Sequence, residues 1–315
     1  MKTIAADAIN RALSFPMLVD ALDRAFASNI TVPPRLHYDI ENPTASRETT
    51  LLMMPAWQAG DVAGIKLVTV APDNAEKGLA SILGTYILLD VDTGRMKAMM
   101  DAPSLTAKRT AAASALASRY LSSSDSSTLL MVGTGTLSPE LIRAHVSVRP
   151  IKRVLIWGRS EEKTQAVISQ LSDLPLSFEI APSLEKAVTE ADIISVATLS
   201  QTPLIKGAWL SPGQHLDMVG AYRPDMREMD DDCLLRGRIF VDNVPGATKE
   251  TGDIVIPLAQ GVISETDIEA DLFDLAQQKY IVDRKPADIT VFKSVGHALE
   301  DLAAAKLVAL QEGIE

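Results

Sequence analysis

A chain of 315 residues with 47% hydrophobic and 23% charged residues has the composition of a soluble globular protein, long enough for two domains of roughly 100 to 200 residues each. Its formal net charge of −11 excludes nucleic acid and anionic membranes as expected partners, because both are polyanions. No apolar run reaches the roughly 20 residues of a membrane span, and no signal peptide is recognisable, so a cytoplasmic location is expected. The single cysteine, Cys233, lacks neighbours at metal-site spacing, and we expect no metal.

The first part of the chain predicts a small α+β domain over residues 1–121. Apolar residues recur at three- and four-residue steps through the first 30 residues, which indicates helix, until Pro33 and Pro34 end the pattern. An alanine-rich helix and a serine-rich linker are expected at 105–121 and 122–127. The predicted strands, which would form a small sheet on the N-terminal helices, are 51–54, 63–70 and 82–89.

The second part of the chain, residues 122–296, opens on an apolar run that ends in glycines. Residues 129–132 predict a buried strand, and the residues around Pro139 predict the first turns of a helix. Between them, Gly133 permits a tight turn and Gly135 lets the backbone approach a pyrophosphate, whose charge the helix N–H groups would hold. Ser138 replaces the third glycine of this fingerprint. A tight turn without a ligand is the alternative interpretation, since glycine pairs after strands are common.

The end of the next strand indicates which dinucleotide would bind. Residues 152–157 predict a second strand about 20 residues further on, where a dinucleotide fold places the group that contacts the adenosine ribose. An NAD site would need Asp or Glu there, whereas this chain has Gly158, Arg159 and Ser160. Arginine suits a 2′-phosphate, although a solvated arginine at a strand end is the alternative. NADPH is therefore the predicted cofactor, with NADH as the other candidate.

Strand and helix patterns then alternate to the end of the chain. Such repetition predicts a Rossmann-type doubly wound parallel sheet with ligands at the C-terminal strand ends. Residues 297–310 predict a final helix, and we expect residues 297–315 to return to the N-terminal domain. The further predicted strands are 177–180, 193–197, 215–219, 238–242 and 291–296, with helices at 161–171 and 184–189.

Several short stretches, in this order, resemble the ornithine cyclodeaminase and μ-crystallin family over essentially the whole chain. The resemblance implies an N-terminal domain for substrate binding and dimerisation, joined to a Rossmann domain that binds NAD(H) or NADP(H). It also implies a homodimer. Members include deaminating cyclases, alanine dehydrogenases and reductases of cyclic ketimines. The stretches are Pro34-Arg35, 53–57, 64–68, 105–112, 133–135, 223–230, 251–253 and 292–296.

Two departures favour the reductase branch of this family. The deaminating cyclases keep a glutamate and an aspartate at positions that correspond here to Leu52 and Tyr222. The segment 221–228 is instead similar to the μ-crystallin and pyrroline-carboxylate reductase branch. We therefore predict reduction of Δ1-pyrroline-2-carboxylate, and of Δ1-piperideine-2-carboxylate, to L-proline and L-pipecolate. Ornithine cyclodeamination, an alanine dehydrogenase-like activity and a non-enzymatic NADPH-binding protein are the alternatives.

The resemblance also implies the site residues. Arg35 and Arg109 would hold the substrate carboxylate, because the planar arginine fork matches two oxygens, and Met53 would line the same pocket. Lys66 lies in an apolar strand where burial must pair its charge or lower its pKa, and it is predicted to be catalytic together with Arg109. The implied cofactor contacts are Thr110, Gly133, Thr134, Gly135, Thr136, Leu137, Arg159, Ser160, Ala197, Thr198, Val219, Gly220, Lys293, Ser294, Val295 and Gly296.

Four other polar residues have a structural interpretation beside or in place of a functional one. His297 follows the turn expected near the nicotinamide, but a histidine at a helix N-terminus is the alternative. Asp225, Arg227 and Glu228 are expected to form a structural cluster of ion pairs at a helix start.

Overall fold

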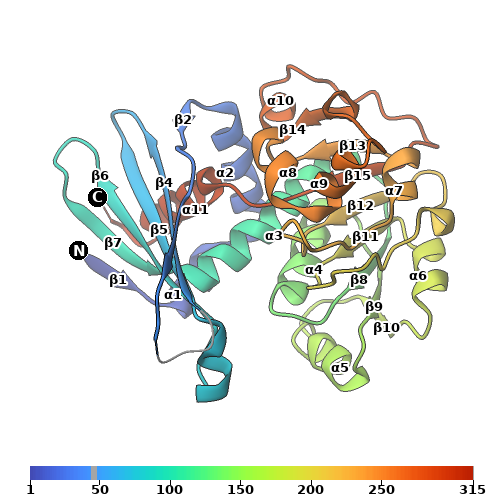
Figure 1. The fold of residues 1–315 in the computed structure, drawn as a ribbon, viewed down its shortest axis with the longest axis horizontal. Helices are drawn as coiled ribbons and strands as arrows, with labels where there is room; N and C mark the ends of the chain where they lie inside the picture. The colour runs from blue at the N-terminus through green and yellow to red at the C-terminus, as the bar shows by residue number, and fades with distance from the viewer. Residues whose placement is uncertain (44–47, 315) are drawn as a thin grey trace. The chain divides into compact units, whose positions relative to one another are not determined.

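The computed structural model describes residues 1–43 and 48–314 and divides the chain into two compact units (Figure 1). Unit 1 comprises Met1–Arg109 and His297–Glu315, and unit 2 comprises Thr110–Gly296. The boundary falls within helix α3 (Ala102–Leu121), earlier than the expected boundary after residue 121, because α3 is one continuous helix whose contacts change partway along its length.

Unit 1 is a mainly antiparallel sheet covered by helices. The strand order is β1-β7-β6-β5-β4-β2, and β3 also pairs with β4. Helix α11 packs against β4, β5 and β6 and against the helices α1 and α2. The strands are β1 (Lys2–Ile4), β2 (Ile30–Thr31), β3 (Leu36–Ile40), β4 (Thr49–Gln58), β5 (Val62–Val70), β6 (Ile82–Asp90) and β7 (Met96–Asp101); the helices are α1 (Ala6–Ala12), α2 (Phe15–Ala27), η1 (Pro72–Lys77) and α11 (Ala298–Gln311).

Helix α2 shows why this arrangement is stable. Ser14 precedes the helix and a proline occupies its first turn, where the missing N–H has no partner to lose. Its buried side chains recur at three- and four-residue steps and form one apolar face. These side chains are Phe15, Leu18, Val19, Leu22, Ala25 and Phe26.

Unit 2 is an eight-stranded parallel sheet with the order β10-β9-β8-β11-β12-β15-β13-β14. Strands β11, β12 and β15 are buried along their whole length, as strands covered on both faces are. The strands are β8 (Thr128–Val132), β9 (Arg153–Trp157), β10 (Ser177–Ile180), β11 (Ile193–Val196), β12 (His215–Met218), β13 (Arg238–Val241), β14 (Ile268–Asp271) and β15 (Thr290–Lys293).

Helices connect these parallel strands, which confirms the predicted Rossmann-type doubly wound fold. The chain moves outward from β8 to β9 and β10, and then returns to β11 on the other side of β8. The direction therefore reverses between β8 and β11. The helices and short 3₁₀ turns are α4 (Leu137–Val148), α5 (Glu161–Ser169), α6 (Leu184–Glu190), η2 (Gly207–Trp209), α7 (Asp231–Arg236), α8 (Val244–Glu250), α9 (Gly252–Ala259), η3 (Glu265–Asp267) and α10 (Leu272–Ala276).

Within the described ranges, no helix combines the length and the apolar character that crossing a membrane requires.

Candidate active site

The glycine turn after β8 lies at the reversal point of the unit 2 sheet. Gly133 has a φ of +117°, and a Cβ on it would lie 2.4 Å from the carbonyl oxygen of Ala197, so only glycine fits. Ser138, in the first turn of α4, is buried and donates a hydrogen bond to the Gly133 carbonyl oxygen at 3.0 Å. The serine that replaces the third glycine thus fastens the helix start to the strand end.

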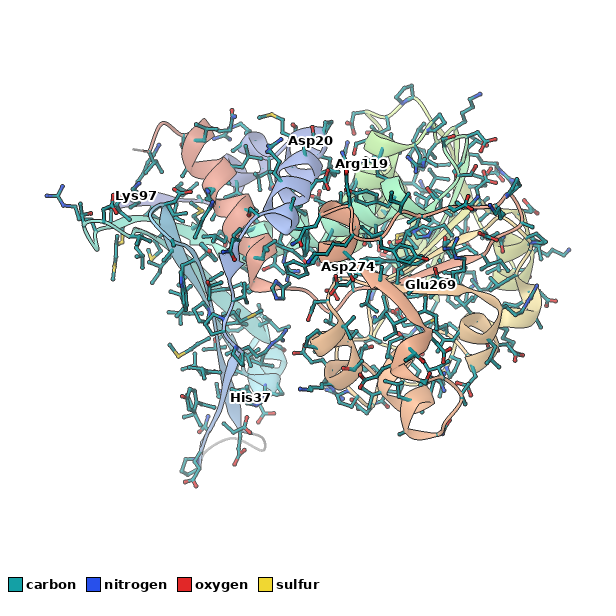
Figure 2. The ribbon with its side chains drawn as sticks, turned by 90° about the horizontal axis from the view of Figure 1, so that it is seen from above. Asp20, His37, Lys97, Arg119, Glu269 and Asp274 are labelled. Atoms are coloured by element: carbon teal, nitrogen blue, oxygen red, sulfur yellow. The ribbon has the colours of Figure 1, made fainter. Side chains whose placement is uncertain are left out.

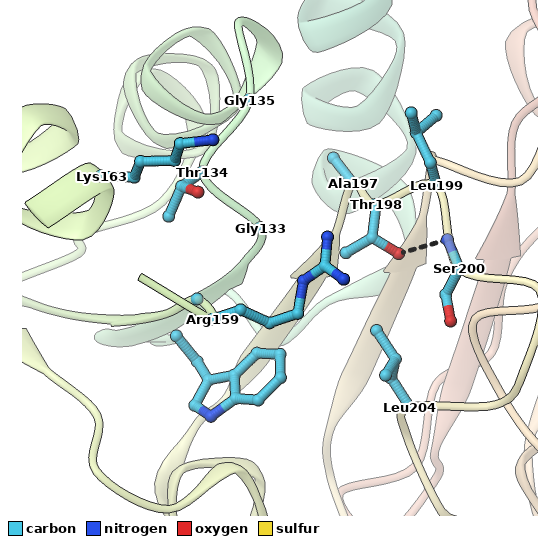
Figure 3. Close-up of a pocket in the computed structure, with 12 residues that line it drawn as sticks. Gly133, Thr134, Gly135, Arg159, Lys163, Ala197, Thr198, Leu199, Ser200 and Leu204 are labelled. Carbon is cyan, nitrogen blue, oxygen red and sulfur yellow. Dashed lines mark hydrogen bonds between the residues drawn. The ribbon is translucent and has the colours of Figure 1, made fainter. Parts of the chain in front are cut away.

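A pocket of about 390 Å³ opens beside this turn (Figure 3). Its walls come from the loops that follow β8, β9 and β11, which is where doubly wound sheets bind their ligands. No atom lies within 4 Å of a Cβ built on Gly135, so the backbone there is open to a ligand. The lining residues are Gly133, Thr134, Gly135, Trp157, Gly158, Arg159, Lys163, Ala197, Thr198, Leu199, Ser200 and Leu204.

Two cations line the pocket on the side of β9. Arg159 follows the strand, and its side chain extends toward the loop that carries Ala197 and Thr198 (Figure 3). Lys163 lies four residues later, in the first turn of α5, and also lines the pocket. Lys163 was not among the predicted cofactor residues, although its position four residues after Arg159, at a helix start, could have indicated it.

The predicted cofactor residues fall into two groups. Six of them line the pocket: Gly133, Thr134, Gly135, Arg159, Ala197 and Thr198. The remaining ones are not among the described residues of its lining. Ser160 caps α5, because its hydroxyl accepts a hydrogen bond from the Lys163 N–H. Lys293 is fully buried, and its Nζ lies 3.5 Å from an Asp253 carboxylate oxygen, so it is an internal counter-ion rather than a pocket side chain.

Unit 1 contains a buried cluster of charges, which we call the Lys66 cluster: Lys66, Arg109, Glu300 and Asp301. Lys66 Nζ lies 2.6 Å from Asp301 Oδ2. Arg109 donates from Nε to Asp301 Oδ1 at 3.0 Å and from Nη1 to Glu300 Oε2 at 2.6 Å. The cations are 3% and 6% exposed and both acids are fully buried, so two positive and two negative charges balance inside unit 1.

The two acids of the cluster were missed by sequence reasoning. Glu300 and Asp301 lie in the first turn of α11, between the buried residues Leu299 and Leu302. Acids are common in the first turn of a helix because they favour its N-terminal dipole, and this ordinary explanation hid them. The signal that could have revealed them is their place on a helix that is otherwise almost entirely apolar.

Burial controls the protonation of the cluster. It lowers the pKa of Lys66 to about 8, an effect that Asp301 opposes and Arg109 reinforces. Burial also raises the pKa of Asp301, but Lys66 and Arg109 outweigh it and hold that pKa below its usual value. Burial disfavours the charge of Arg109, yet Asp301 and Glu300 raise its pKa overall. Lys66 is therefore the member of the cluster that can exchange a proton near neutral pH.

His297 lies next to this cluster at the start of α11. Burial lowers the pKa of His297 to about 4, and Arg109 and Arg35 lower it further while Asp301 raises it. The imidazole is consequently neutral at physiological pH. Arg35, which is half-buried just before β3, is close enough to act on His297, so the sheet brings it to the same region as Arg109.

The register of the sheet separates two neighbouring methionines. Met54 and Tyr86 are the direct partners of Lys66 on β4 and β6, so their side chains share its buried face. Met53 pairs with Leu67 and therefore points to the opposite face. The neighbour of Lys66 on β4 is therefore Met54. Met53, which was predicted to line the substrate pocket, points away from Lys66.

A model of the ornithine cyclodeaminase/mu-crystallin family matches residues 4–312. The chain belongs to this family. A Δ1-pyrroline-2-carboxylate reductase of Colwellia psychrerythraea is 36% identical over 98% of both chains. The structure of the Thermococcus litoralis Δ1-pyrroline-2-carboxylate reductase, in complex with NADH and L-proline, superimposes with a TM-score of 0.91 at 30% identity, over 100% of this chain and 99% of the other. An archaeal alanine dehydrogenase dimer with bound NAD gives 0.90 at 28% identity, over 100% and 97%.

At the two positions where we expect the deaminating cyclases of this family to keep acids, this chain has Leu52 and Tyr222. Leu52 lies half-buried on β4, and Tyr222 is 50% exposed in the loop after β12. Among the described residues, no group of three or more His, Cys, Asp or Glu side chains is placed to hold a metal ion.

Proposed function

We propose that the protein is an NAD(P)H-dependent reductase of cyclic ketimine acids that converts Δ1-pyrroline-2-carboxylate to L-proline. The observation that carries the proposal is the Lys66 cluster, in which a lysine with a pKa of about 8 lies beside an arginine in a buried site. Reduction of an imine acid needs a proton for the nitrogen and a cation for the carboxylate, and the cluster provides one of each. The names of the Colwellia and Thermococcus relatives support the same reaction.

The cofactor is held in the pocket of unit 2. The glycine turn fits a pyrophosphate, because Gly133 brings the backbone close to the next strand and Gly135 leaves its surface open. The bound nicotinamide supplies the hydride that the C=N carbon of the substrate accepts. Titration of NADH or NADPH into the protein, followed by nicotinamide fluorescence, measures this binding directly.

Lys66 delivers the proton. Its ammonium group donates to the imine nitrogen, and the neutral amine that remains regains a proton from solvent before the next turnover. A pKa of about 8 suits this role, because the group is largely protonated at neutral pH and still acidic enough to give the proton away. Asp301 orients the ammonium through the 2.6 Å ion pair.

Arg109 and Arg35 bind the substrate carboxylate. The Nε and Nη1 atoms of Arg109 are occupied by Asp301 and Glu300, whereas no acceptor among the described residues is within hydrogen-bond distance of Nη2. That nitrogen is therefore available for one carboxylate oxygen, and Arg35 contributes the second cation. Arg35 contributes a further positive charge beside the incoming carboxylate.

NADPH is the preferred cofactor. Arg159 and Lys163 line the same side of the pocket and give two positive charges to a 2′-phosphate, while none of the lining residues is the acid that would bind a ribose 2′-hydroxyl.

The six-membered ketimine Δ1-piperideine-2-carboxylate is a second substrate in this proposal. One assay tests the function as a whole: the two ketimines with NADPH, and ornithine with NAD⁺, are incubated side by side with the protein. We expect loss of nicotinamide absorbance with equimolar L-proline or L-pipecolate, and no ammonia from ornithine. Ammonia release without imine reduction would instead identify a cyclodeaminase.

We also propose that the protein is a homodimer formed through the sheet of unit 1. The face of the unit 1 sheet opposite Lys66 exposes large apolar side chains, a pattern typical of interaction surfaces. It includes Tyr38 on β3, which is 51% exposed, and Leu83 in the same cross-strand row, which is 49% exposed. Strand β3 can be found in Figure 2 by its labelled residue His37, the chain neighbour of Tyr38. Met53 shares this face, and the archaeal relative is a dimer.

We expect light scattering at micromolar concentration to give the mass of a dimer and Tyr38→Lys to shift it toward the monomer. A monomeric wild-type protein would refute the proposed interface.

A further inference from the structure

The loop after β11, which lines the pocket, and the loop after β12 converge on one side chain, Glu228. Oε1 of Glu228 accepts hydrogen bonds from the backbone N–H of Thr198 at 2.6 Å and from its hydroxyl at 2.8 Å. Oε2 accepts from the N–H groups of Gly220 at 2.6 Å and Ala221 at 3.0 Å. One carboxylate therefore joins the ends of two neighbouring strands, and Thr198 itself lines the pocket.

The acceptor capacity of this carboxylate is full. An ionised carboxylate offers about four lone-pair sites, and here four donors occupy them. Gly220 packs so closely that a Cβ on it would lie 2.4 Å from Glu228 Oε1, which leaves no room for a different arrangement. A proton can join the carboxylate only if one of the four donors moves away.

Charges from two other elements face Glu228. Asp253, on α9, accepts a hydrogen bond from the Glu228 N–H at 2.8 Å, and Lys293, at the end of β15, lies 3.5 Å from Asp253. Lys293 also attracts Asp242, which accepts from the N–H groups of Val295 at 2.8 Å and Gly296 at 2.6 Å. All four side chains are fully buried, so one lysine serves three carboxyl groups.

This shortage of positive charge places Glu228 close to a protonation change. Burial raises the pKa of Glu228 to about 7, Asp253 raises it as well, and Lys293 and the donors of Thr198 lower it. The carboxylate that joins the two loops can thus take up a proton within the physiological range.

We propose that Glu228 is a positioning residue for the nicotinamide cofactor: its ionised carboxylate holds the loops after β11 and β12 in the arrangement that the cofactor binds, and its protonation weakens that binding. The inference rests on the proposed function, because it takes the pocket of unit 2 as the nicotinamide site. It assigns no contact with the cofactor to Glu228 itself. The sequence analysis expected only a structural cluster at this position.

The test is the dissociation constant of NADH as a function of pH. NADH is the probe because it lacks the 2′-phosphate, whose own pKa is near 6. For the wild-type protein we expect the Kd to be constant above pH ~7 and to rise by up to about tenfold per pH unit below it. In Glu228→Gln, whose amide cannot accept from all four donors, the Kd at pH 8 should be about tenfold or more higher, and the rise at low pH should disappear.

A second variant should shift the pH dependence of the NADH Kd while keeping the hydrogen bonds between Glu228 and the loops. Lys293→Met removes the cation that stabilises ionised Glu228, so the rise of the Kd should begin at a higher pH. The matched control is Glu269→Gln, because Glu269 (labelled in Figure 2) is a part-buried acid that, like Glu228, is held by several donors, here Arg238 and Tyr280, and it does not line the pocket. This control should keep the wild-type Kd and the wild-type profile.

Circular dichroism establishes that each variant is folded. A folded Glu228→Gln protein with the wild-type Kd and profile would overturn the inference and leave the proposed function intact. If Glu228→Gln does not fold, the wild-type and Lys293→Met profiles decide, and a flat wild-type profile would overturn it. A wild-type protein that binds neither NADH nor NADPH would overturn the proposed function and this inference with it.

Discussion

Each unit buries a group of charges, but the two groups are built differently. In unit 1, Lys66 and Arg109 pair with Glu300 and Asp301, side chain against side chain, and positive and negative charges are equal in number. In unit 2, Lys293 faces three carboxyl groups, whose hydrogen bonds go chiefly to backbone N–H groups of loops. The ion pairs of unit 1 determine which side chains are protonated. The hydrogen bonds of unit 2 hold the backbone of the loops in place.

The difference follows from what buried charge requires. A buried ion must recover the hydration that it loses, either from an opposite charge or from hydrogen bonds. A balanced set of ion pairs keeps Arg109 and Asp301 ionised and leaves Lys66 adjustable. Backbone N–H groups replace the water that the Glu228 carboxylate loses on burial, but only while the loops stay in place. The ionisation of Glu228 and the positions of the loops therefore depend on one another. Unit 1 is therefore expected to govern turnover, and unit 2 cofactor affinity.

The largest effect is expected from Lys66→Met, which removes the proposed proton donor. We expect the kcat for Δ1-pyrroline-2-carboxylate reduction to fall about 100-fold or more, because positioned acids contribute effects of that order, with the Kd of NADH unchanged. Asp301 keeps its bond to Arg109 in this variant. Lys97→Met is the control, since Lys97 is a part-buried lysine of unit 1 that, like Lys66, is paired with an acid, here Asp90. Steady-state kinetics with normal kcat in Lys66→Met would contradict the role of unit 1.

A smaller effect is expected from Arg109→Lys, which keeps the charge but loses the planar fork. A charge-assisted hydrogen bond is worth about 1.5 to 3 kcal/mol, so the KM for the ketimine should rise about 10- to 100-fold, with a weaker effect on kcat. Arg143→Lys, which alters a bidentate pair with Asp173 in unit 2, should leave the KM unchanged. An unaltered KM in Arg109→Lys would mean that the arginine only balances its two acids.

The smallest effect is expected from Arg159→Ala in unit 2, which should reduce the preference for NADPH over NADH by about tenfold, because Lys163 remains. Affinity for NADH should hardly change. Arg153→Ala is the control, as Arg153 is bound to Glu179 and Glu190 and does not line the pocket. Equal affinities for the two cofactors in the wild-type protein would remove the basis of this prediction.

The parallel sheet of unit 2 was largely predictable. Its strands are short apolar runs bounded by glycines and polar residues, and no end of the predicted ranges for β8, β9, β10 and β11 is wrong by more than one residue. Strand β14 was missed, because Ile268–Asp271 has two acids in four residues and lies at the edge of the sheet. In unit 1, β1, β3 and β7 were missed. Strand β3 alternates apolar and polar residues, but it is exposed along its whole length and follows closely on Pro33 and Pro34, which indicated a break in structure rather than a strand.

The site was predictable only in part. A lysine inside an apolar strand revealed Lys66, and the glycine turn revealed the pocket, because both signals are local in sequence. The partners of Lys66 come from a helix more than 200 residues away, and no local pattern joins Lys66 to Asp301. Lys293 matched a family stretch, but its burial as a counter-ion depends on Asp253, which only the folded sheet brings near. Met53, predicted to line the substrate pocket, lies on the face of the sheet opposite Lys66, because the face of each β4 residue depends on the exact register of that strand.

The pH dependence of kcat in the wild-type protein and in Asp301→Asn tests the central claim, that a buried acid sets the protonation of the catalytic lysine. The assay is NADPH-dependent reduction of Δ1-pyrroline-2-carboxylate with both substrates saturating. Because the ammonium form donates the proton, wild-type kcat should be level below pH ~8 and fall above it. Asp301 raises the pKa of Lys66, so in Asp301→Asn the fall should begin at a lower pH. Identical pH profiles for the two proteins, or a wild-type protein that does not reduce the ketimine, would contradict the account.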